Sequence, residues 1–252
     1  MISKNQIKHI QSLHQKKHRQ IEKRFIAEGV KTCLEIIETS PELLEQLFCT
    51  ENFLKEYQST LIKNKISSIV ITNTQLAKIS ALSTPNEVVG ICKQMNDDVP
   101  QINFEKDFSF YLDGIRDPGN LGTIIRICSW FGINELFCSE DTVELYNPKC
   151  IQSCMGAFLR VKVFYMPFEN LLKDRMPITV YAADLKGTSV YNATDPRGLI
   201  IIGNEANGIS ENLKKLANSF ITIPSAKSDT ESLNAAIATA VIASEFFRKK
   251  IS

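Results

Sequence analysis

Histidine is nearly absent from this sequence of 252 residues. The three histidines, His9, His14 and His18, lie in the first 18 residues, and residues 19–252 contain none. A Ser-His-Asp or Cys-His catalytic centre would need a histidine from that short stretch, and the HExxH zinc motif is missing. Any acid–base chemistry must therefore use Arg, Lys, Glu, Asp, Tyr or Cys.

Long hydrophobic runs and paired cysteines are also missing. No apolar run reaches the roughly 18 residues that cross a bilayer, and the first residues lack the apolar segment of a secretory signal. We therefore expect a cytoplasmic protein that does not contact a membrane. None of the seven cysteines belongs to a CxxC pair, which indicates buried thiols with neither disulfides nor a metal site. With 44% hydrophobic and 23% charged residues, the composition is that of a globular protein.

The net charge of +1 conceals a basic N-terminal arm. Residues 1–24 contain seven Lys or Arg and one acid, so this arm carries +6 and the rest of the chain carries −5. Such an arm is typical of a segment that binds a polyanion, and the alternative is a solvated helix face. The basic residues of the arm are Lys4, Lys8, Lys16, Lys17, Arg19, Lys23 and Arg24.

Helical and strand-like patterns alternate on both sides of a polar segment at 96–106, which we interpret as a linker. Before it, apolar spacing predicts a helix over 19–38, with Phe25 and Ile26 on its apolar stripe, and strands at 44–50, 65–72 and 87–93. After it, the pattern predicts strands at 107–113, 133–139, 160–166, 178–184, 199–203 and 220–224, and helices at 121–131, 147–157, 211–217 and 232–250. The alternation predicts two α/β regions.

Three polar loops follow predicted strands of the second region. The first, DGIRDPGNLG at 113–122, places Asn120 as a cap for the next helix. Arg126 stands in that helix as the only charged residue between Asp117 and Glu135, so it is either buried in an ion pair or directed at a ligand.

The second loop, GNEANGIS at 203–210, presents Glu205 between glycines. The third, at 223–234, presents Ser232 and Asn234 beside the helix N–H groups that follow. Taken alone, each loop also has a purely structural interpretation. The second would be a capping turn, and the third would be an ordinary helix N-cap. In an open α/β sheet, however, ligands bind at the carboxyl ends of the strands, where all three loops lie.

Nucleotide-binding motifs do not explain these loops. Gly114 and Gly119 have Walker A spacing, but Asn120 stands where the phosphate-binding lysine must be. No GxGxxG follows a predicted strand. A P-loop NTPase and a dinucleotide-dependent dehydrogenase are therefore disfavoured.

The three loops together resemble the SpoU (TrmH) family of RNA ribose 2′-O-methyltransferases. DPGNLGTIIR, GNEANG and IP…SLNAA stand in the family's order, and the resemblance covers roughly residues 107–252. The segments KRFIAEGVKTCLEII and STPNEVVGIC resemble the L30e-like substrate-binding domain that often precedes it.

The resemblance implies a SPOUT-type trefoil-knotted α/β domain at 107–252, preceded by a small α/β, L30e-like domain at 1–96 and a linker at 97–106. It implies S-adenosylmethionine as cofactor, ribosomal or transfer RNA as substrate (ribosomal being favoured), a homodimer and no metal. Methyl transfer from a sulfonium needs no histidine, and the 2′-hydroxyl distinguishes RNA from DNA.

The resemblance also assigns roles to residues. Arg126 is the chief catalytic group, acting beside the ribose 2′-hydroxyl and its phosphate, and the basic arm binds RNA. The other predicted catalytic residues are Asn120, Glu205, Ser232 and Asn234. The predicted cofactor-binding residues are Gly203, Asn204, Glu205, Gly208, Ile223, Ser232 and Leu233.

One loop departs from the family pattern. The usual IPMxG is replaced by Ile223-Pro224-Ser225-Ala226-Lys227, and the spacing to Ser232 is one residue longer. This change leaves open a non-catalytic RNA-binding protein that keeps the fold, which would bind no cofactor. A small-molecule α/β enzyme is a third possibility and would have no use for the basic arm.

Overall fold

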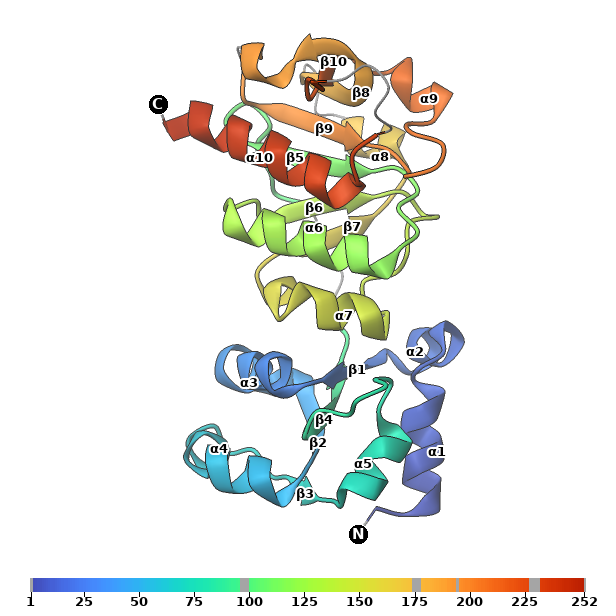
Figure 1. The fold of residues 1–252 in the computed structure, drawn as a ribbon, viewed down its shortest axis with the longest axis vertical. Coiled ribbons are helices and arrows are strands. Elements are labelled where there is room, and N and C mark those ends of the chain that lie inside the picture. Colours follow the sequence, from blue (N-terminus) through green and yellow to red (C-terminus); the bar gives the residue numbers. More distant parts are fainter. Residues whose placement is uncertain (1, 96–99, 174–177, 194, 227–231, 252) are drawn as a thin grey trace. The chain divides into compact units, whose positions relative to one another are not determined.

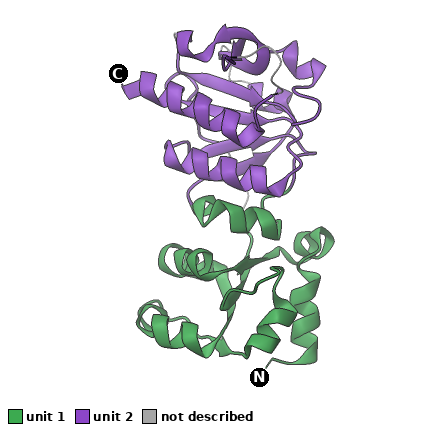
Figure 2. Cartoon of the chain, viewed as in Figure 1, with its two compact units in different colours: residues 1–97, 144–159 green, residues 98–143, 160–252 purple. Residues whose placement is uncertain are grey.

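The computed structural model describes residues 2–95, 100–173, 178–193, 195–226 and 232–251. The chain divides into two compact units, the first formed by residues 1–97 and 144–159 and the second by 98–143 and 160–252 (Figure 2). The division thus differs from a single boundary at the linker, because residues 144–159 join the first unit.

The first unit is built on a four-stranded mixed sheet with the order β1-β4-β2-β3 (Figure 1). Strand β4 runs antiparallel to β1 and β2, and β3 runs parallel to β2. The strands are β1 (Arg24–Glu28), β2 (Leu44–Cys49), β3 (Ile69–Val70) and β4 (Val88–Lys93). The helices of this unit are α1 (Lys4–Ser12), α2 (Lys16–Glu22), α3 (Val30–Thr39), α4 (Glu51–Lys63), α5 (Asn73–Ile79) and α7 (Pro148–Cys154), with short 3-10 turns η1 (Pro41–Leu43) and η2 (Ala157–Leu159).

The single helix predicted over 19–38 is wrong. Lys23 has a left-handed backbone (φ 53°) that ends α2, and Gly29 (φ 96°) separates β1 from α3. Phe25 and Ile26 are adjacent in β1 and both are buried. A short strand buried on both faces shows the same apolar run as part of a buried helix, so spacing alone misassigned it.

Helix α7 packs on β1, although the SpoU resemblance places it in the second region. The Phe25 ring lies 4.8 Å from the Tyr146 ring and 5.7 Å from the Phe158 ring. The Tyr146 hydroxyl also accepts a hydrogen bond from the Met95 backbone nitrogen at 2.9 Å. These aromatic and polar contacts attach residues 144–159 to the first unit.

The second unit is built on a six-stranded sheet with the order β10-β8-β9-β5-β6-β7, and every neighbouring pair is parallel. The strands are β5 (Phe108–Leu112), β6 (Glu135–Cys138), β7 (Lys162–Tyr165), β8 (Val180–Ser189), β9 (Gly198–Ile202) and β10 (Ser219–Thr222). The helices are α6 (Pro118–Trp130), α8 (Phe168–Leu172), α9 (Glu211–Lys214) and α10 (Ala235–Ile251), with the 3-10 turn η3 (Val190–Asn192). All six strands predicted for this region are present, and the predicted α/β class is confirmed.

This parallel arrangement positions the three polar loops. Strands β5 and β9 are neighbours, and β10 pairs with β8 on the other side of β9. Their carboxyl ends lie at one edge of the sheet, so the loops after 112, 202 and 222 leave from that edge. Helix α10 packs beside α6 (Figure 1). No helix among the described residues is long and apolar enough to span a bilayer.

Candidate active site

The first loop leads into α6 through a cap that differs from the predicted one. Asp117, not Asn120, is the N-cap: its carboxylate accepts a hydrogen bond from the Asn120 backbone nitrogen at 2.9 Å, and Pro118 occupies the first helical turn. Because Asp117 caps the helix, the Asn120 side chain is available for contacts with other loops.

The Asn120 amide joins all three loops. Its Nδ2 donates to a carboxylate oxygen of Glu205, and its Oδ1 accepts from Asn234 Nδ2 at 3.0 Å. Asn234 in turn uses its own Oδ1 to accept from the backbone nitrogens of Ala236 and Ile237 at 2.9 and 3.4 Å, at the start of α10. The result is a hydrogen-bonded chain from Glu205 through Asn120 to Asn234. Asn120 and Asn234 are 114 positions apart in the sequence.

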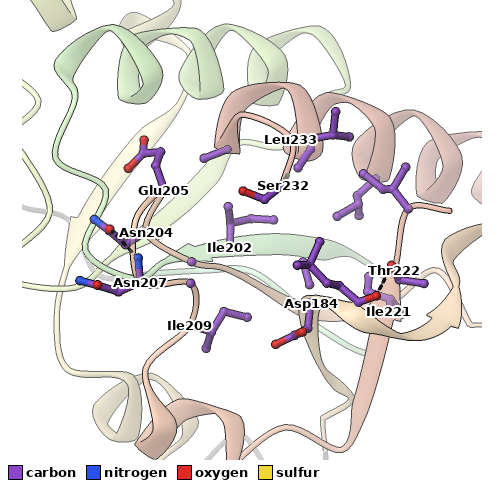
Figure 3. Close-up of a pocket in the computed structure, with 18 of the residues that line it drawn as sticks. Asp184, Ile202, Asn204, Glu205, Asn207, Ile209, Ile221, Thr222, Ser232 and Leu233 are labelled. Carbon is purple, nitrogen blue, oxygen red and sulfur yellow. Dashed lines mark hydrogen bonds between the residues drawn. The ribbon is translucent and has the colours of Figure 1, made fainter. Parts of the chain in front are cut away.

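A cavity of about 370 Å³ lies beside this chain and is lined by all seven predicted cofactor-binding residues (Figure 3). Its apolar wall includes the buried side chains of Ile202, Ile209 and Ile221. In Figure 3, Glu205 and Ser232 lie on one side of the cavity, and Asp184 lies on another side. Such a volume, with apolar walls and few polar groups, is typical of a small-molecule site.

Asp184 and Lys214 are lining residues that the sequence analysis missed. Lys214 Nζ lies 3.5 Å from the Asp184 carboxylate and 3.2 Å from that of Glu211. The hydrogen bond with Glu211, assisted by the charge of Asp184, raises the pKa of Lys214, so this ammonium stays charged at neutral pH. Asp184 ends the predicted strand 178–184, so, like Glu205, it could have been recognised as a carboxylate at the end of a strand. No sequence pattern marks Lys214.

Arg126 is placed differently from the other predicted catalytic residues. Asn120, Glu205 and Asn234 are hydrogen-bonded together, and Ser232 lines the cavity with Glu205. The Arg126 side chain is exposed on α6, is not among the lining residues, and has no hydrogen bond or ion pair within the described part of the chain. Its alternative role as a buried structural ion pair is therefore not realised.

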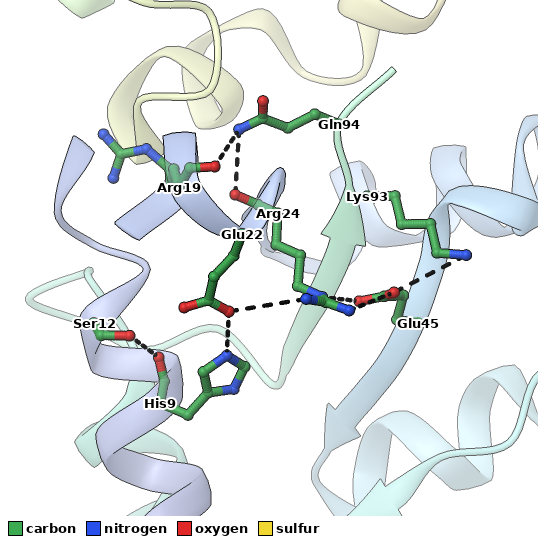
Figure 4. A network of polar contacts seen from close by, with 8 residues as sticks. All are labelled: His9, Ser12, Arg19, Glu22, Arg24, Glu45, Lys93 and Gln94. Atoms are coloured by element: carbon green, nitrogen blue, oxygen red, sulfur yellow. Dashed lines mark hydrogen bonds and ion pairs between the residues drawn. The ribbon is translucent and has the colours of Figure 1, made fainter. Parts of the chain in front are cut away.

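Two cations of the N-terminal arm are engaged inside the first unit (Figure 4). Arg19 is buried, donates to the Leu13 carbonyl at 2.8 Å and pairs with Glu144. Arg24 pairs with the Glu45 carboxylate. The prediction that Arg19 binds RNA is corrected, because a buried, paired guanidinium cannot reach a phosphate, and Arg24 is already neutralised by its carboxylate partner. The five lysines of the arm are exposed.

Comparison with known proteins decides the family. Residues 107–244 match the model described as the SpoU rRNA Methylase family, and residues 4–90 match an MRM3-like substrate binding domain. The chain belongs to the SpoU rRNA methylase family. The first match covers the three loops, and the second agrees with the predicted substrate-binding region.

Named relatives include two modifiers of 23S rRNA. The chain is 31% identical over 180 residues to the 23S rRNA (uridine(2479)-2′-O)-methyltransferase of Streptomyces viridochromogenes. The matched region spans 67% of this chain and 62% of that protein. It is 23% identical over 95% of both chains to the 23S rRNA (guanosine(2553)-2′-O)-methyltransferase RlmP of Bacillus subtilis.

Solved structures show the same fold over the whole chain. A putative RNA methyltransferase of the TrmH family from Porphyromonas gingivalis has a TM-score of 0.84 at 31% identity, covering 99% of both chains. The SpoU methyltransferase AviRb from Streptomyces viridochromogenes, in complex with AdoMet, has a TM-score of 0.84 at 25% identity with the same coverage. The predicted SPOUT-type fold is confirmed.

Proposed function

We propose that this protein transfers a methyl group from S-adenosylmethionine to a ribose 2′-hydroxyl of ribosomal RNA, in the cytoplasm. The observation that carries the proposal is the chain of Glu205, Asn120 and Asn234 beside the cavity at the carboxyl edge of the sheet. Membership of the SpoU family and the rRNA-modifying relatives support the reaction and the class of RNA.

The cavity fits the cofactor. Its volume of about 370 Å³ and its isoleucine-lined wall suit a nucleoside, and the half-buried Asp184 and Lys214 add charged groups. The backbone passes so close to Gly203 that no other residue fits there. A Cβ would lie 2.3 Å from the Gly208 carbonyl carbon, so any side chain would displace the cavity wall. The altered loop after β10 still places Ile223 in the lining. The cofactor supplies an electrophilic methyl group bonded to a sulfonium.

The residues of the three loops orient the RNA ribose. Glu205, Asn120 and Asn234 hold one another by hydrogen bonds, so their side chains keep a fixed arrangement beside the cavity that Glu205 lines. A guanidinium remains protonated at neutral pH, so Arg126 acts by stabilising the developing alkoxide and by holding the adjacent phosphate with two parallel donors. The hydroxyl proton leaves to a phosphate oxygen or to water.

The exposed position of Arg126 favours a homodimer. Trp130, one turn further along α6, is 84% exposed, and Ile237 on the neighbouring α10 is 53% exposed. A large exposed aromatic side chain such as Trp130 is a typical anchor of a protein interface. A second copy packed against the side of α6 that carries Arg126 and Trp130 would cover Trp130 and bring Arg126 to the cavity of its partner. Ile242 and Phe246 of α10, by contrast, are buried within the chain.

The proposal is tested by single-turnover methylation of ribosomal RNA with labelled cofactor. Methylation should appear as resistance of one phosphodiester bond to alkaline cleavage, because a methylated 2′-oxygen cannot attack its phosphate. Arg126→Ala and Arg126→Lys should both lose about 10²–10³ in turnover, since only the planar fork provides two donors. Cofactor affinity, measured by calorimetry, should be unchanged in both variants.

The homodimer has its own test. Heterodimers of Arg126→Ala and Glu205→Gln protomers should be far more active than either variant homodimer, if each site combines the two protomers. Absence of cofactor binding by the wild-type protein would instead favour the non-catalytic RNA-binding alternative. Binding of cofactor without methylation of any ribosomal RNA would contradict the proposed substrate.

A further inference from the structure

Residues 204–208 form a small closed hairpin that carries Glu205 at its tip. The backbone nitrogen of Asn204 donates to the Gly208 carbonyl at 3.0 Å, and the Gly208 nitrogen donates back to the Asn204 carbonyl at 2.8 Å. Inside the hairpin, Asn204 Oδ1 accepts from the backbone nitrogens of Ala206 and Asn207 at 2.9 and 3.2 Å. One side chain, that of Asn204, therefore organises the whole turn (Figure 3).

The same side chain attaches the hairpin to the loop after β5. Asn204 Nδ2 donates to the Gly114 carbonyl at 2.6 Å, and the Gly114 nitrogen itself donates to Ser139 Oγ at 2.9 Å. Beyond the hairpin, the Ser210 nitrogen donates to the Asp113 carboxylate at 2.7 Å. Two contacts thus flank Glu205 and join the second loop to the loop that leads to Asn120.

We propose that Asn204 is a positioning residue that holds Glu205 in hydrogen-bonding reach of Asn120. This inference rests on the proposed function for its effect on catalysis, but the geometry concerns the free protein. The sequence analysis assigned Asn204 to cofactor binding. In the structure Asn204 lines the cavity, but its side-chain oxygen and its amide nitrogen are already hydrogen-bonded within the chain.

The amide is the required group because the position needs an acceptor and a donor at once. In Asn204→Asp, the oxygen that accepts from Ala206 and Asn207 is kept, but the donor to Gly114 is replaced by a second oxygen facing a carbonyl. In Asn204→Ala both functions are lost. The pair of variants therefore separates formation of the turn from its attachment.

The first experiment is a double-mutant cycle in single-turnover methylation with saturating cofactor. Asn204→Asp should slow methyl transfer about 10-fold, which is the value of one lost hydrogen bond of about 1.4 kcal/mol. In the Glu205→Gln background the same change should cost less than about 2-fold, because a residue that acts through Glu205 has nothing left to position. The cofactor dissociation constant should change less than about 3-fold in Asn204→Asp.

The second experiment does not depend on activity. Amide hydrogen exchange at Ala206 and Asn207 in the cofactor-free protein should be faster in Asn204→Ala and nearly unchanged in Asn204→Asp. Asn170→Asp, an exposed asparagine on α8, is the matched control and should alter neither methylation nor exchange.

Three results would overturn the inference. If the losses from Asn204→Asp and Glu205→Gln multiply, or if cofactor affinity falls in parallel with turnover, Asn204 acts as a direct cofactor contact. Unchanged exchange in Asn204→Ala would show that its side chain does not organise the hairpin. Failure of the wild-type protein to methylate RNA would refute the proposed function, while the exchange measurement would still decide the role of Asn204.

Discussion

The ion pair between Arg19 and Glu144 provides a direct test of how the first unit is held together. Arg19 comes from α2, and Glu144 begins the segment 144–159 that rejoins this unit after the first part of the second. The Arg19 side chain is 2% exposed and that of Glu144 is 16% exposed, so the pair is largely removed from water. Arg19 also donates to the Leu13 carbonyl.

The expected magnitude follows from this burial. Removing one partner of a buried ion pair costs about 3–5 kcal/mol, because the remaining charge is left without compensation. Glu144 keeps some contact with water, so we take the lower end, about 3 kcal/mol, for Arg19→Met. With a urea dependence of about 1.5–3 kcal/mol per molar, the unfolding midpoint of the first unit should fall by about 1–2 M.

The assay is urea unfolding followed by circular dichroism, with Arg19→Met, Glu144→Gln and the double variant. Arg19→Met keeps most of the apolar stem, so its loss reports the charge. The double variant should be less destabilised than the sum of the single changes, since it leaves no buried charge unpaired. Lys16→Met, at an exposed position of α2, is the control and should not move the midpoint. An unchanged midpoint in Arg19→Met, together with weaker RNA binding, would return Arg19 to the RNA-binding surface and refute the argument.

Three further predictions concern the arm, the cavity and the last helix. Changing the exposed Lys4 and Lys8 to Gln should weaken RNA binding and reduce the salt slope by about 0.7–0.9 for each lost phosphate contact, measured by filter binding; an unchanged slope would make them solvated surface. Gly203→Ala should abolish cofactor binding in calorimetry, because its Cβ would lie 2.3 Å from a backbone carbon, and normal affinity would contradict the tight path. Hydrogen bonding to Arg248 lowers the pKa of Glu245 to about 2, so its contribution to stability is present above about pH 4.3 and is lost as the pH falls toward 2. Thermal unfolding of Glu245→Gln should therefore be less sensitive to acid over that range than the wild type, and equal sensitivity would exclude this pair as the cause.

The sequence predicted the second unit well because its signals are local. Six apolar strands bounded by polar loops identify a parallel sheet, and the loops that follow them must leave at one edge. The resemblance to the SpoU family assigned Gly203, Ile223 and Leu233 to cofactor binding, and all three line the cavity at this edge. The residues of the three loops meet because the strands before them are parallel, and alternating strands and helices indicate a parallel sheet.

The remaining features depend on partners that are distant in sequence. Arg19 is buried because Glu144, 125 positions away, returns to the first unit, and no local pattern shows this pairing. Residues 19–38 were misassigned because burial on both faces of β1 produces an apolar run without a strand's alternation. The exposure of Arg126 was not foreseen because its apolar neighbours in the sequence lie on the other faces of α6, which are buried.

The three loops of the site share one structural device, and it explains why asparagine recurs there. Asp117 uses its carboxylate to cap α6, whereas Asn204 and Asn234 use their carbonyl oxygens to organise the turn that follows each of them. An oxygen is sufficient for that local task. Asn204 and Asn234 must also donate to a neighbouring loop, to Gly114 and Asn120 respectively, and a carboxylate has no such donor at neutral pH. In the first loop, two residues share these two tasks. Asp117 caps the helix, and Asn120 makes the hydrogen bonds to the other loops. A site without histidine thus obtains its fixed geometry from amides that satisfy their own loop and bind the next.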